Sequence, residues 1–431
     1  MKIKIKNIFL IVIVFDFLYL INSKELFEDY YEKAEEILKN MTRNEKIGQI
    51  FLPRYNILTA DDEIKKYSPA GFVLFGNNIK DHSKEELIKE LDERREKSKI
   101  PLVFGVGEEG GTVCRVSLYF RDKPFPSPQE SYSAGGFKEI LSIEQEKRDL
   151  LRELTLNYNF APVADISLNS SDYMYARTLG KDVETTSNYI NKVVDSYYND
   201  NFTCCLKHFP GYGNNTNTHD DVSHDYRPID YLKKNDLVPF INAIGHKVPM
   251  IMVSHNIVMD IDNEYPSSLS KKVHDLLRKE NNYTGLIVTD SLSMGAITKY
   301  TKNISASVLA VLAGNDLIVT STFEEHIDSL IQAVDKNEVN MSLIETAAKR
   351  VIAWKLKYIY SNENPKSWNT IFLYFLGAVV IIGVIILIVC IFMRKKYKNE
   401  LNNSDDEQNN ENDTNENRLI SNNSEQRESD N

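Results

Sequence analysis

Eight short apolar runs recur between residues 25 and 360 of this 431-residue chain, and amphipathic stretches separate them. Short buried strands that alternate with amphipathic helices are typical of parallel β-sheets with helical crossovers. The runs cover residues 47–52, 71–75, 102–106, 159–163, 202–206, 250–253, 286–288 and 316–319. Eight strands in one domain of this length favour an α/β fold of the (β/α)8 TIM-barrel type, with a doubly wound open sheet as the alternative.

Polar side chains follow most of these runs. In a (β/α)8 barrel, the residues after each strand converge on one pocket at the carboxyl ends of the strands. The residues in these positions are Glu108, Glu109 and Arg115 after the third run, Asp165 after the fourth, Lys207 and His208 after the fifth, His255 and Asn256 after the sixth, and Asp290 after the seventh. We therefore expect carboxylates, cations and imidazoles to cluster at one end of the barrel, which is the composition of an active site.

The segment after the fifth run has the densest group of such residues. Lys207-His-Phe-Pro-Gly-Tyr-Gly213 places a lysine and an imidazole where the strand is expected to give way to its loop, and a second imidazole follows at His219. The glycines and asparagines between them are typical of a turn-rich loop. The spacing matches none of the histidine and cysteine patterns of zinc sites, so we expect no metal and no cofactor.

Three cysteines lie outside the apolar C-terminal stretch, namely Cys114, Cys204 and Cys205. Four cysteines in all are too few to staple a chain of this size with disulfides. Adjacent residues of a strand point to opposite faces of the sheet. The pair therefore favours buried free thiols, with a metal site as the alternative.

The N-terminus has the pattern of a secretory signal peptide over residues 1–23. Lys2, Lys4 and Lys6 precede an apolar stretch that ends before Asn22. Asp16 lies inside this stretch, so an uncleaved membrane anchor is the alternative.

The C-terminal part predicts a transmembrane helix. Residues 371–393 carry no charge, and a run longer than about 20 residues crosses the hydrocarbon core of a bilayer. A basic cluster at 394–398 follows, and such clusters stay on the cytoplasmic side. We expect a single-pass type I membrane protein of the cell surface or an endomembrane, with domain 24–366 lumenal or extracellular and a membrane segment within 367–393.

The last segment, 394–431, is rich in Asn, Glu, Asp and Ser and poor in apolar residues, which predicts a disordered cytoplasmic tail. A solvated spacer and a sorting or adaptor-binding segment are both consistent with this composition. The net charge of −11 belongs partly to this tail, and the folded part has no basic patch. These charges argue against nucleic acid as a partner.

Four motifs in order along the chain resemble those of a known family. They are Ala161-Pro-Val-Ala-Asp165, Lys207-His-Phe-Pro-Gly-Tyr-Gly213, Val253-Ser-His-Asn256 and Thr289-Asp-Ser-Leu-Ser-Met294. The chain resembles glycoside hydrolase family 3, specifically its single-barrel β-N-acetylglucosaminidase (β-hexosaminidase) branch, from Glu45 through Leu317. The resemblance implies a (β/α)8 barrel that hydrolyses terminal β-linked N-acetylhexosamine.

The same resemblance implies roles for individual residues. It makes Asp290 the nucleophile that forms a covalent glycosyl-enzyme, and His219 the general acid/base in place of the usual second carboxylate. Asn217 takes the position of the residue that orients His219. The substrate-binding positions implied by the family are Arg115, Arg177, Lys207 and His208. Taken without its motif, Asp290 would be more typical of a helix N-cap.

Two positions depart from the family pattern. Gly107 stands where the family usually has an aspartate that binds distal sugar hydroxyls, and Asn217 stands where it has an aspartate beside the histidine. A charged acceptor contributes about 1.5 to 3 kcal/mol, so we expect affinity to be about ten- to a hundredfold lower unless Glu108 or Glu109 replaces the missing acid. An amide at 217 orients an imidazole without adding charge, and the acids directly after His219 are candidates to supply it.

Two classes of function remain open on the sequence. The first is a membrane-anchored retaining glycoside hydrolase that removes terminal N-acetylglucosamine from a glycan or glycoconjugate. The second is a catalytically weakened family member that binds carbohydrate or a partner at a surface. A third possibility, a different sugar such as glucose, follows from the reshaped pocket at Gly107.

Overall fold

The computed structural model describes residues 24–218, 221–301 and 305–360. The chain divides into two compact units, of which the first, Met1–Asn362, contains all of these residues.

The predicted signal peptide, the predicted membrane segment 367–393 and the predicted tail lie outside the described residues. Within the described part of the chain, no helix is both long enough and apolar enough to cross a membrane.

Eight parallel strands form the centre of the first unit. They are β1 (Phe51–Pro53), β2 (Gly71–Val73), β3 (Val103–Val106), β4 (Tyr158–Asn159), β5 (Thr203–Phe209), β7 (Met250–Val253), β9 (Leu286–Thr289) and β10 (Ile318–Thr320). The strands from β2 to β9 pair in chain order in one sheet, and β1 pairs with β10. Isolated bridges join β1 to β2 through Arg54 and Val73, and β9 to β10 through Val288 and Leu317. This order is that of the predicted TIM-like (β/α) barrel rather than an open doubly wound sheet.

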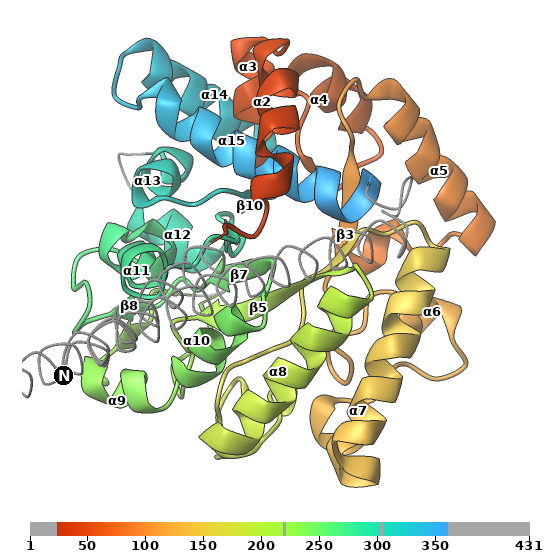
Figure 1. Cartoon of the computed structure of the whole chain (residues 1–431), viewed down its shortest axis with the longest axis vertical. Helices are drawn as coiled ribbons and strands as arrows, with labels where there is room; N and C mark the ends of the chain where they lie inside the picture. Colours follow the sequence, from red (N-terminus) through yellow and green to blue (C-terminus); the bar gives the residue numbers. More distant parts are fainter. Residues whose placement is uncertain (1–23, 219–220, 302–304, 361–431) are drawn as a thin grey trace, which may run out of the picture. The chain divides into compact units, whose positions relative to one another are not determined.

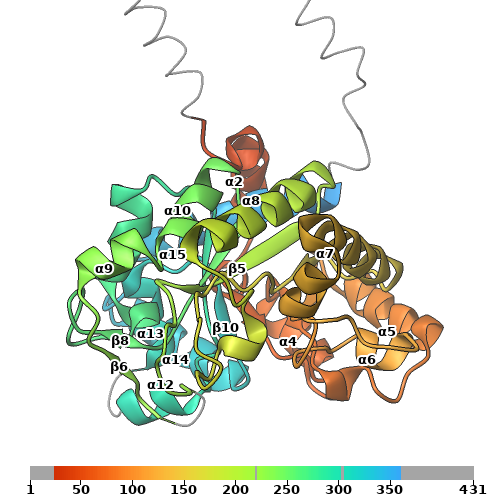
Figure 2. The ribbon, with the colours of Figure 1, turned by 90° about the horizontal axis from the view of Figure 1, so that it is seen from below.

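Helices connect the strands and surround them (Figure 1). The helices are α2 (Tyr31–Lys39), α3 (Arg43–Gly48), α4 (Ala60–Tyr67), α5 (Lys84–Lys97), α6 (Ser117–Phe120), α7 (Pro128–Glu153), α8 (Val183–Asn199), α9 (Ile229–Lys234), α10 (Val238–Gly245), α11 (Lys271–Asp275), α12 (Gly295–Tyr300), α13 (Ala306–Ala313), α14 (Phe323–Asp335) and α15 (Met341–Lys355). Figure 2 shows α8 between α7 and α10, so neighbours in the chain are also neighbours around the barrel.

The first strand begins later than predicted, because a helix precedes it. The Thr42 side chain accepts a hydrogen bond from the Glu45 N–H, and the Glu45 carboxylate accepts one from the Thr42 N–H. This is the predicted capping box, and it starts helix α3, which extends through Gly48. The predicted strand 47–52 is therefore wrong in its first half, where the cap stabilises a helix.

The fifth strand ends later than predicted. Strand β5 continues to Phe209, so Lys207 and His208 lie within its last residues and not in the loop after it. The pairing of β5 with β7 shifts register between Leu206 and Phe209. Polar residues extend this strand because their backbone groups still pair with neighbouring segments, while their side chains have buried polar partners.

Two hydrophobic clusters fill the core, and adjacent cysteines of β5 enter different ones. Cys204 packs in a cluster with residues of α8 and α10, such as Tyr189 and Phe240. Cys205 packs in a second cluster with the strand residues Met250 and Leu286. Both thiols are buried and free, as the alternation of a strand predicts, and the thiol of Cys114 is buried and free as well.

Lys355 at the end of α15 ties that helix to the amino ends of two strands. Its ammonium donates to the Gln49 side chain at 2.6 Å and to the carbonyls of Ala70 at 3.2 Å and Pro101 at 2.7 Å. Ala70 and Pro101 precede β2 and β3, at the end of the barrel opposite to the carboxyl ends of the strands. Burial lowers the pKa of Lys355 to about 7.

Candidate active site

Asp290 is the residue directly after β9. Its N–H donates to the Val253 carbonyl at 3.1 Å, and its Oδ1 accepts from the Ser291 N–H at 2.7 Å. The half-buried carboxylate is therefore held at the carboxyl ends of β7 and β9. The next helix, α12, has Met294 as its N-cap, so Asp290 does not cap a helix.

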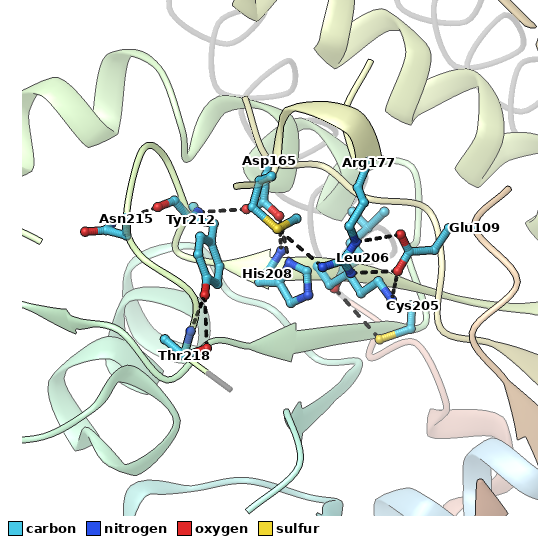
Figure 3. Close-up of polar contacts among 12 residues, drawn as sticks. Glu109, Asp165, Arg177, Cys205, Leu206, His208, Tyr212, Asn215 and Thr218 are labelled. Carbon is cyan, nitrogen blue, oxygen red and sulfur yellow. Dashed lines mark hydrogen bonds and ion pairs between the residues drawn. The ribbon is translucent and has the colours of Figure 1, made fainter. Parts of the chain in front are cut away.

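Glu109 contacts both Lys207 and Arg177, and Figure 3 shows its contacts with Arg177. Its Oε1 lies 2.6 Å from Lys207 Nζ and 2.7 Å from Arg177 Nη2, and its Oε2 accepts from Arg177 Nε at 2.9 Å. The Glu109 side chain is 3% exposed, Lys207 7% and Arg177 15%. Burial by itself raises the pKa of the Glu109 carboxyl, but the two cations outweigh it and hold that pKa well below its usual range.

His208 and Asp165 form a second buried pair. Nδ1 of His208 lies 2.7 Å from Asp165 Oδ2, and the His208 N–H donates to the same oxygen at 3.2 Å. The other oxygen, Oδ1, accepts from the Tyr212 N–H at 2.7 Å. A carboxylate accepts hydrogen bonds, so Nδ1 carries the imidazole proton and Asp165 fixes the orientation of the ring.

The loop after β5 is anchored by the hydroxyl of Tyr212. This oxygen accepts the Thr218 N–H at 2.8 Å and lies 3.0 Å from both Thr218 Oγ1 and the Thr216 carbonyl. Burial, and after it the charge of Asp290, raises the pKa of Tyr212 to about 12. The hydroxyl therefore stays protonated, and it fixes the position of the residue immediately before His219.

Arg227 supports the same loop. It pairs with Asp225 at 2.6 Å and with Asp236 at 2.7 Å, and it donates to the Gly211 carbonyl at 3.1 Å. Gly211 has a φ of +120°, and a Cβ there would lie 2.4 Å from the Asp236 side chain. Glycine is therefore required at this turn.

His219 lies outside the described residues, and Asn217 lies half-buried within the described part of the loop. The predicted contact between these two residues thus stays a prediction. His224, a few residues further on, forms the short strand β6 (His224–Asp225) that pairs with β8 (Ile257–Val258). It is exposed, and its ring stacks on Tyr226.

Glu108 and Arg115 shape the loop after β3. The Glu108 carboxylate accepts from the N–H groups of Arg115 and Val116, both at 2.7 Å, and from the Ser117 hydroxyl. The Glu108 carboxylate therefore holds the loop and does not replace the missing acid at 107. Among the described residues, the Arg115 guanidinium makes no hydrogen bond or ion pair with the Glu109 cluster.

A side chain at position 107 would begin beside Lys207 without a clash. A Cβ at this position would lie 3.9 Å from Lys207 Nζ and 3.9 Å from Phe160, with nothing closer. An acid here would therefore face the Lys207 ammonium, which in this chain is neutralised by Glu109 instead.

His255 stabilises the segment that follows Asp290. Its Nε2 lies 2.9 Å from the Ser291 carbonyl, and its Nδ1 lies 2.8 Å from the Ser268 hydroxyl. Both ring nitrogens are thus engaged within a fully buried side chain. The imidazole holds the backbone next to Asp290 in place.

Three residues outside the predicted substrate and catalytic set are central to the geometry: Glu109, Asp165 and Tyr212. Glu109 and Asp165 were expected at the carboxyl ends of strands, but no spacing in the sequence says which cation or imidazole each one meets. Tyr212 lies inside the Lys207–Gly213 motif, and only the folded loop shows its hydroxyl beneath Thr218.

The fold and this cluster define a TIM-like barrel with paired acids, cations and an imidazole at the carboxyl ends of its strands, which is where barrel enzymes carry out chemistry. Residues 42–354 match the model described as the glycosyl hydrolase family 3 N terminal domain. The chain belongs to glycosyl hydrolase family 3, as its motifs predicted.

Relatives with the same architecture include proteins named β-hexosaminidases. The chain is 29% identical over 266 residues to β-hexosaminidase LpqI of Mycobacterium tuberculosis, covering 59% of this chain and 68% of that protein. It superposes with a TM-score of 0.69 and 27% identity on a family 3 β-N-acetylglucosaminidase from Paenibacillus sp. str. FPU-7, covering 74% of this chain and 63% of that one. A family 3 glycosyl hydrolase from Mycobacterium smegmatis gives a TM-score of 0.67 and 26% identity, covering 74% of this chain and 98% of that one.

Proposed function

We propose that this protein is a glycosyl hydrolase of the β-hexosaminidase type that removes terminal β-linked N-acetylglucosamine from glycans or glycoconjugates with retention of configuration. The observation that carries the proposal is the placement of Asp290 at the end of β9, on the same end of the barrel as the Lys207–Glu109–Arg177 cluster. Family membership and the names of the relatives support the same reaction class.

In the first step, an oxygen of the Asp290 carboxylate attacks the anomeric carbon of the bound sugar. The bond from that carbon to the leaving-group oxygen breaks, and the oxygen takes a proton from the imidazolium of His219. A glycosyl ester of Asp290 results, with the free alcohol as first product.

In the second step, the now neutral His219 takes a proton from water, and the water oxygen attacks the anomeric carbon. The ester bond breaks, the Asp290 carboxylate is restored, and the sugar leaves with its original configuration. Asn217 orients the imidazole in this proposal. Histidine in this role avoids a second negative charge beside the nucleophile.

Lys207, Arg177 and His208 bind the sugar in this proposal, as Arg115 does from the loop after β3. The ammonium of Lys207 and the guanidinium of Arg177 carry more N–H donors than Glu109 accepts. The remaining N–H groups can donate to sugar oxygens in this proposal. His208, with its proton on Nδ1 toward Asp165, offers Nε2 as an acceptor for a sugar hydroxyl. The pairing with buried acids holds these side chains in place before substrate arrives.

Gly107 supports one alternative, a catalytically weakened family member that binds carbohydrate or a partner. The space beside Lys207 lacks the acid that would accept hydrogen bonds from distal hydroxyls. The same space also leaves glucose as a candidate sugar, and the choice of aryl glycoside in the assay distinguishes these possibilities.

We further propose that the protein is anchored by one helix within 367–393 after removal of a signal peptide, with the barrel on the lumenal or extracellular side. The uncharged run and the basic cluster after it support this topology. Protease protection of the barrel in sealed vesicles, with digestion of the tail, is the test, and digestion of the barrel alone would contradict it.

The test of the activity is hydrolysis of an aryl β-N-acetylglucosaminide by the purified chain between pH 4 and 8, beside an aryl β-glucoside and the Asp290→Asn variant. We expect turnover of the first substrate, and a loss of about 10³-fold or more in the variant. If the folded chain binds the sugar but does not hydrolyse it, the hydrolase proposal is wrong and the carbohydrate-binding alternative takes its place.

A further inference from the structure

Tyr173 presents an aromatic ring to solvent beside the candidate active site. It lies in the segment between β4 and α8 and is 43% exposed. Its ring centroid is 6.0 Å from that of Tyr212, with the planes at 41°. Tyr212 in turn packs edge-on against His208, with centroids 5.7 Å apart. Tyr173, Tyr212 and His208 thus form a row of ring contacts, in which Tyr173 is exposed and His208 is buried in the barrel.

The neighbours of Tyr173 hold its backbone in place. Met174 is fully buried and packs with Val163 and Tyr212 in a small apolar cluster of its own. This cluster fixes the backbone of Tyr173 while the ring itself stays open to solvent on its other side. Tyrosine, which has an apolar ring and a polar hydroxyl, is enriched at binding interfaces.

Contacts of its neighbours place Tyr173 between two parts of the candidate site. The sulfur of Met174, the next residue, lies 3.3 Å from Arg177 Nη1, and Arg177 is a proposed sugar-binding group. Tyr212, against which the ring packs, accepts a hydrogen bond from the Thr218 N–H at 2.8 Å. Tyr173 therefore lies between Arg177 and the loop that Tyr212 anchors.

We propose that Tyr173 forms a binding site for the sugar of the leaving group, which stacks its apolar face on the exposed ring. The inference rests on the proposed function. In the proposed reaction His219 protonates the leaving-group oxygen, and Tyr212 links its neighbour Thr218 to Tyr173. On that proposal, the part of a glycan beyond the cleaved bond lies on the Tyr173 side of the site. A flat aromatic face binds the C–H face of a pyranose, and the phenol adds a hydrogen bond.

This placement has a kinetic consequence. The leaving group is present only in the first step, because hydrolysis of the glycosyl ester takes place after it has left. Removing the ring is then expected to lower kcat/KM for substrates whose leaving group is a sugar. It leaves kcat/KM unchanged for a donor with no leaving-group ring, and it leaves hydrolysis of the ester unchanged.

The test compares two substrates, the disaccharide of two β-linked N-acetylglucosamine units and N-acetylglucosaminyl fluoride. We expect Tyr173→Ala to lower kcat/KM for the disaccharide about five- to tenfold and to leave that for the fluoride within about twofold. Tyr173→Trp should retain disaccharide hydrolysis. Tyr231→Ala, which removes a ring of similar exposure on α9, should change neither substrate.

Equal losses on both substrates in Tyr173→Ala would overturn the inference, because the ring would then act only by supporting Tyr212. Unchanged hydrolysis of both would overturn it as well. If the unmodified chain hydrolyses neither substrate, the proposed function fails, and calorimetric binding of the disaccharide decides the role of Tyr173. Weaker binding in Tyr173→Ala than in Tyr231→Ala would then support the stacking site, and equal binding would contradict it.

Discussion

Lys207 Nζ lies 2.6 Å from Oε1 of Glu109, inside a barrel end where both side chains are more than nine-tenths buried. The same carboxylate also takes two hydrogen bonds from Arg177. One acid thus balances two cations that come from different parts of the chain. The sugar-binding end of the barrel is built around this acid, although the family resemblance alone did not single it out.

We expect Glu109→Gln to destabilise the protein by about 3 to 5 kcal/mol, because it leaves two buried cations without their acid. The KM should rise as well, since Lys207 and Arg177 lose their fixed positions. Denaturant unfolding and steady-state kinetics measure the two effects. The matched control is Glu146→Gln, which breaks an exposed ion pair with Arg121 and should cost less than about 1 kcal/mol.

We also expect Glu109→Gln to change how the free energy of unfolding depends on pH in the acid range. The folded pKa of Glu109 is depressed, so its stabilising effect is present above the unfolded value of about 4.3 and is lost as pH falls toward the folded value. Unfolding followed between pH 6 and 3 should show a steeper loss in the unmodified chain than in Glu109→Gln. Parallel profiles would mean that Glu109 does not carry its charge in the folded state.

Gly107→Asp should strengthen sugar binding about ten- to a hundredfold, because it restores a charged acceptor next to Lys207. A Cβ at 107 makes only ordinary van der Waals contacts, so stability should change by less than about 1 kcal/mol. Inhibition by N-acetylglucosamine measures the affinity. Gly107→Asn is the control for added volume without charge, and equal affinity in the two variants would contradict a role for the acid.

His219→Ala should lower kcat about 10²- to 10⁴-fold, as expected for removal of a general acid/base. His224→Ala is the matched control, because His224 is exposed and lies in the short strand that continues the same segment. An aryl glycoside with a good leaving group should lose less activity in His219→Ala than one with a poor leaving group. A loss confined to His224→Ala would assign the proton transfer to that histidine.

Lys355→Met should remove a pH dependence of stability that originates far from the active site. The pKa of Lys355 is about 7 when folded and about 10.4 when unfolded. Between these values the unfolded chain binds one more proton, so the free energy of unfolding rises with pH by on the order of 1 kcal/mol per pH unit.

Chemical denaturation at pH 7, 8 and 9 should show this rise in the unmodified chain and not in Lys355→Met. Lys349→Met, a control at a half-buried lysine of the same helix that pairs with Glu35, should keep this rise. Equal slopes in all three proteins would show that Lys355 remains charged throughout this range.

Much of the fold could be predicted because burial imposes a period on the sequence. Each of the eight predicted runs overlaps or adjoins a strand, and the capping box before α3 formed as expected. The boundaries of the first and fifth strands were wrong for local reasons. The capped helix α3 occupies the start of the first predicted run. Lys207 and His208 stay within β5 because their side chains pair with buried acids.

The sequence by itself determined the barrel, the family and the end of the barrel where chemistry takes place, because strand periodicity and motif order are local properties of the chain. Only the tertiary structure decided that Glu109 joins Lys207 to Arg177, that Asp165 holds His208, and that Tyr212 anchors the loop. Those contacts join segments far apart in the chain. The pairing of buried charges depends on the distance between them and on their loss of hydration, and a local sequence pattern contains neither quantity.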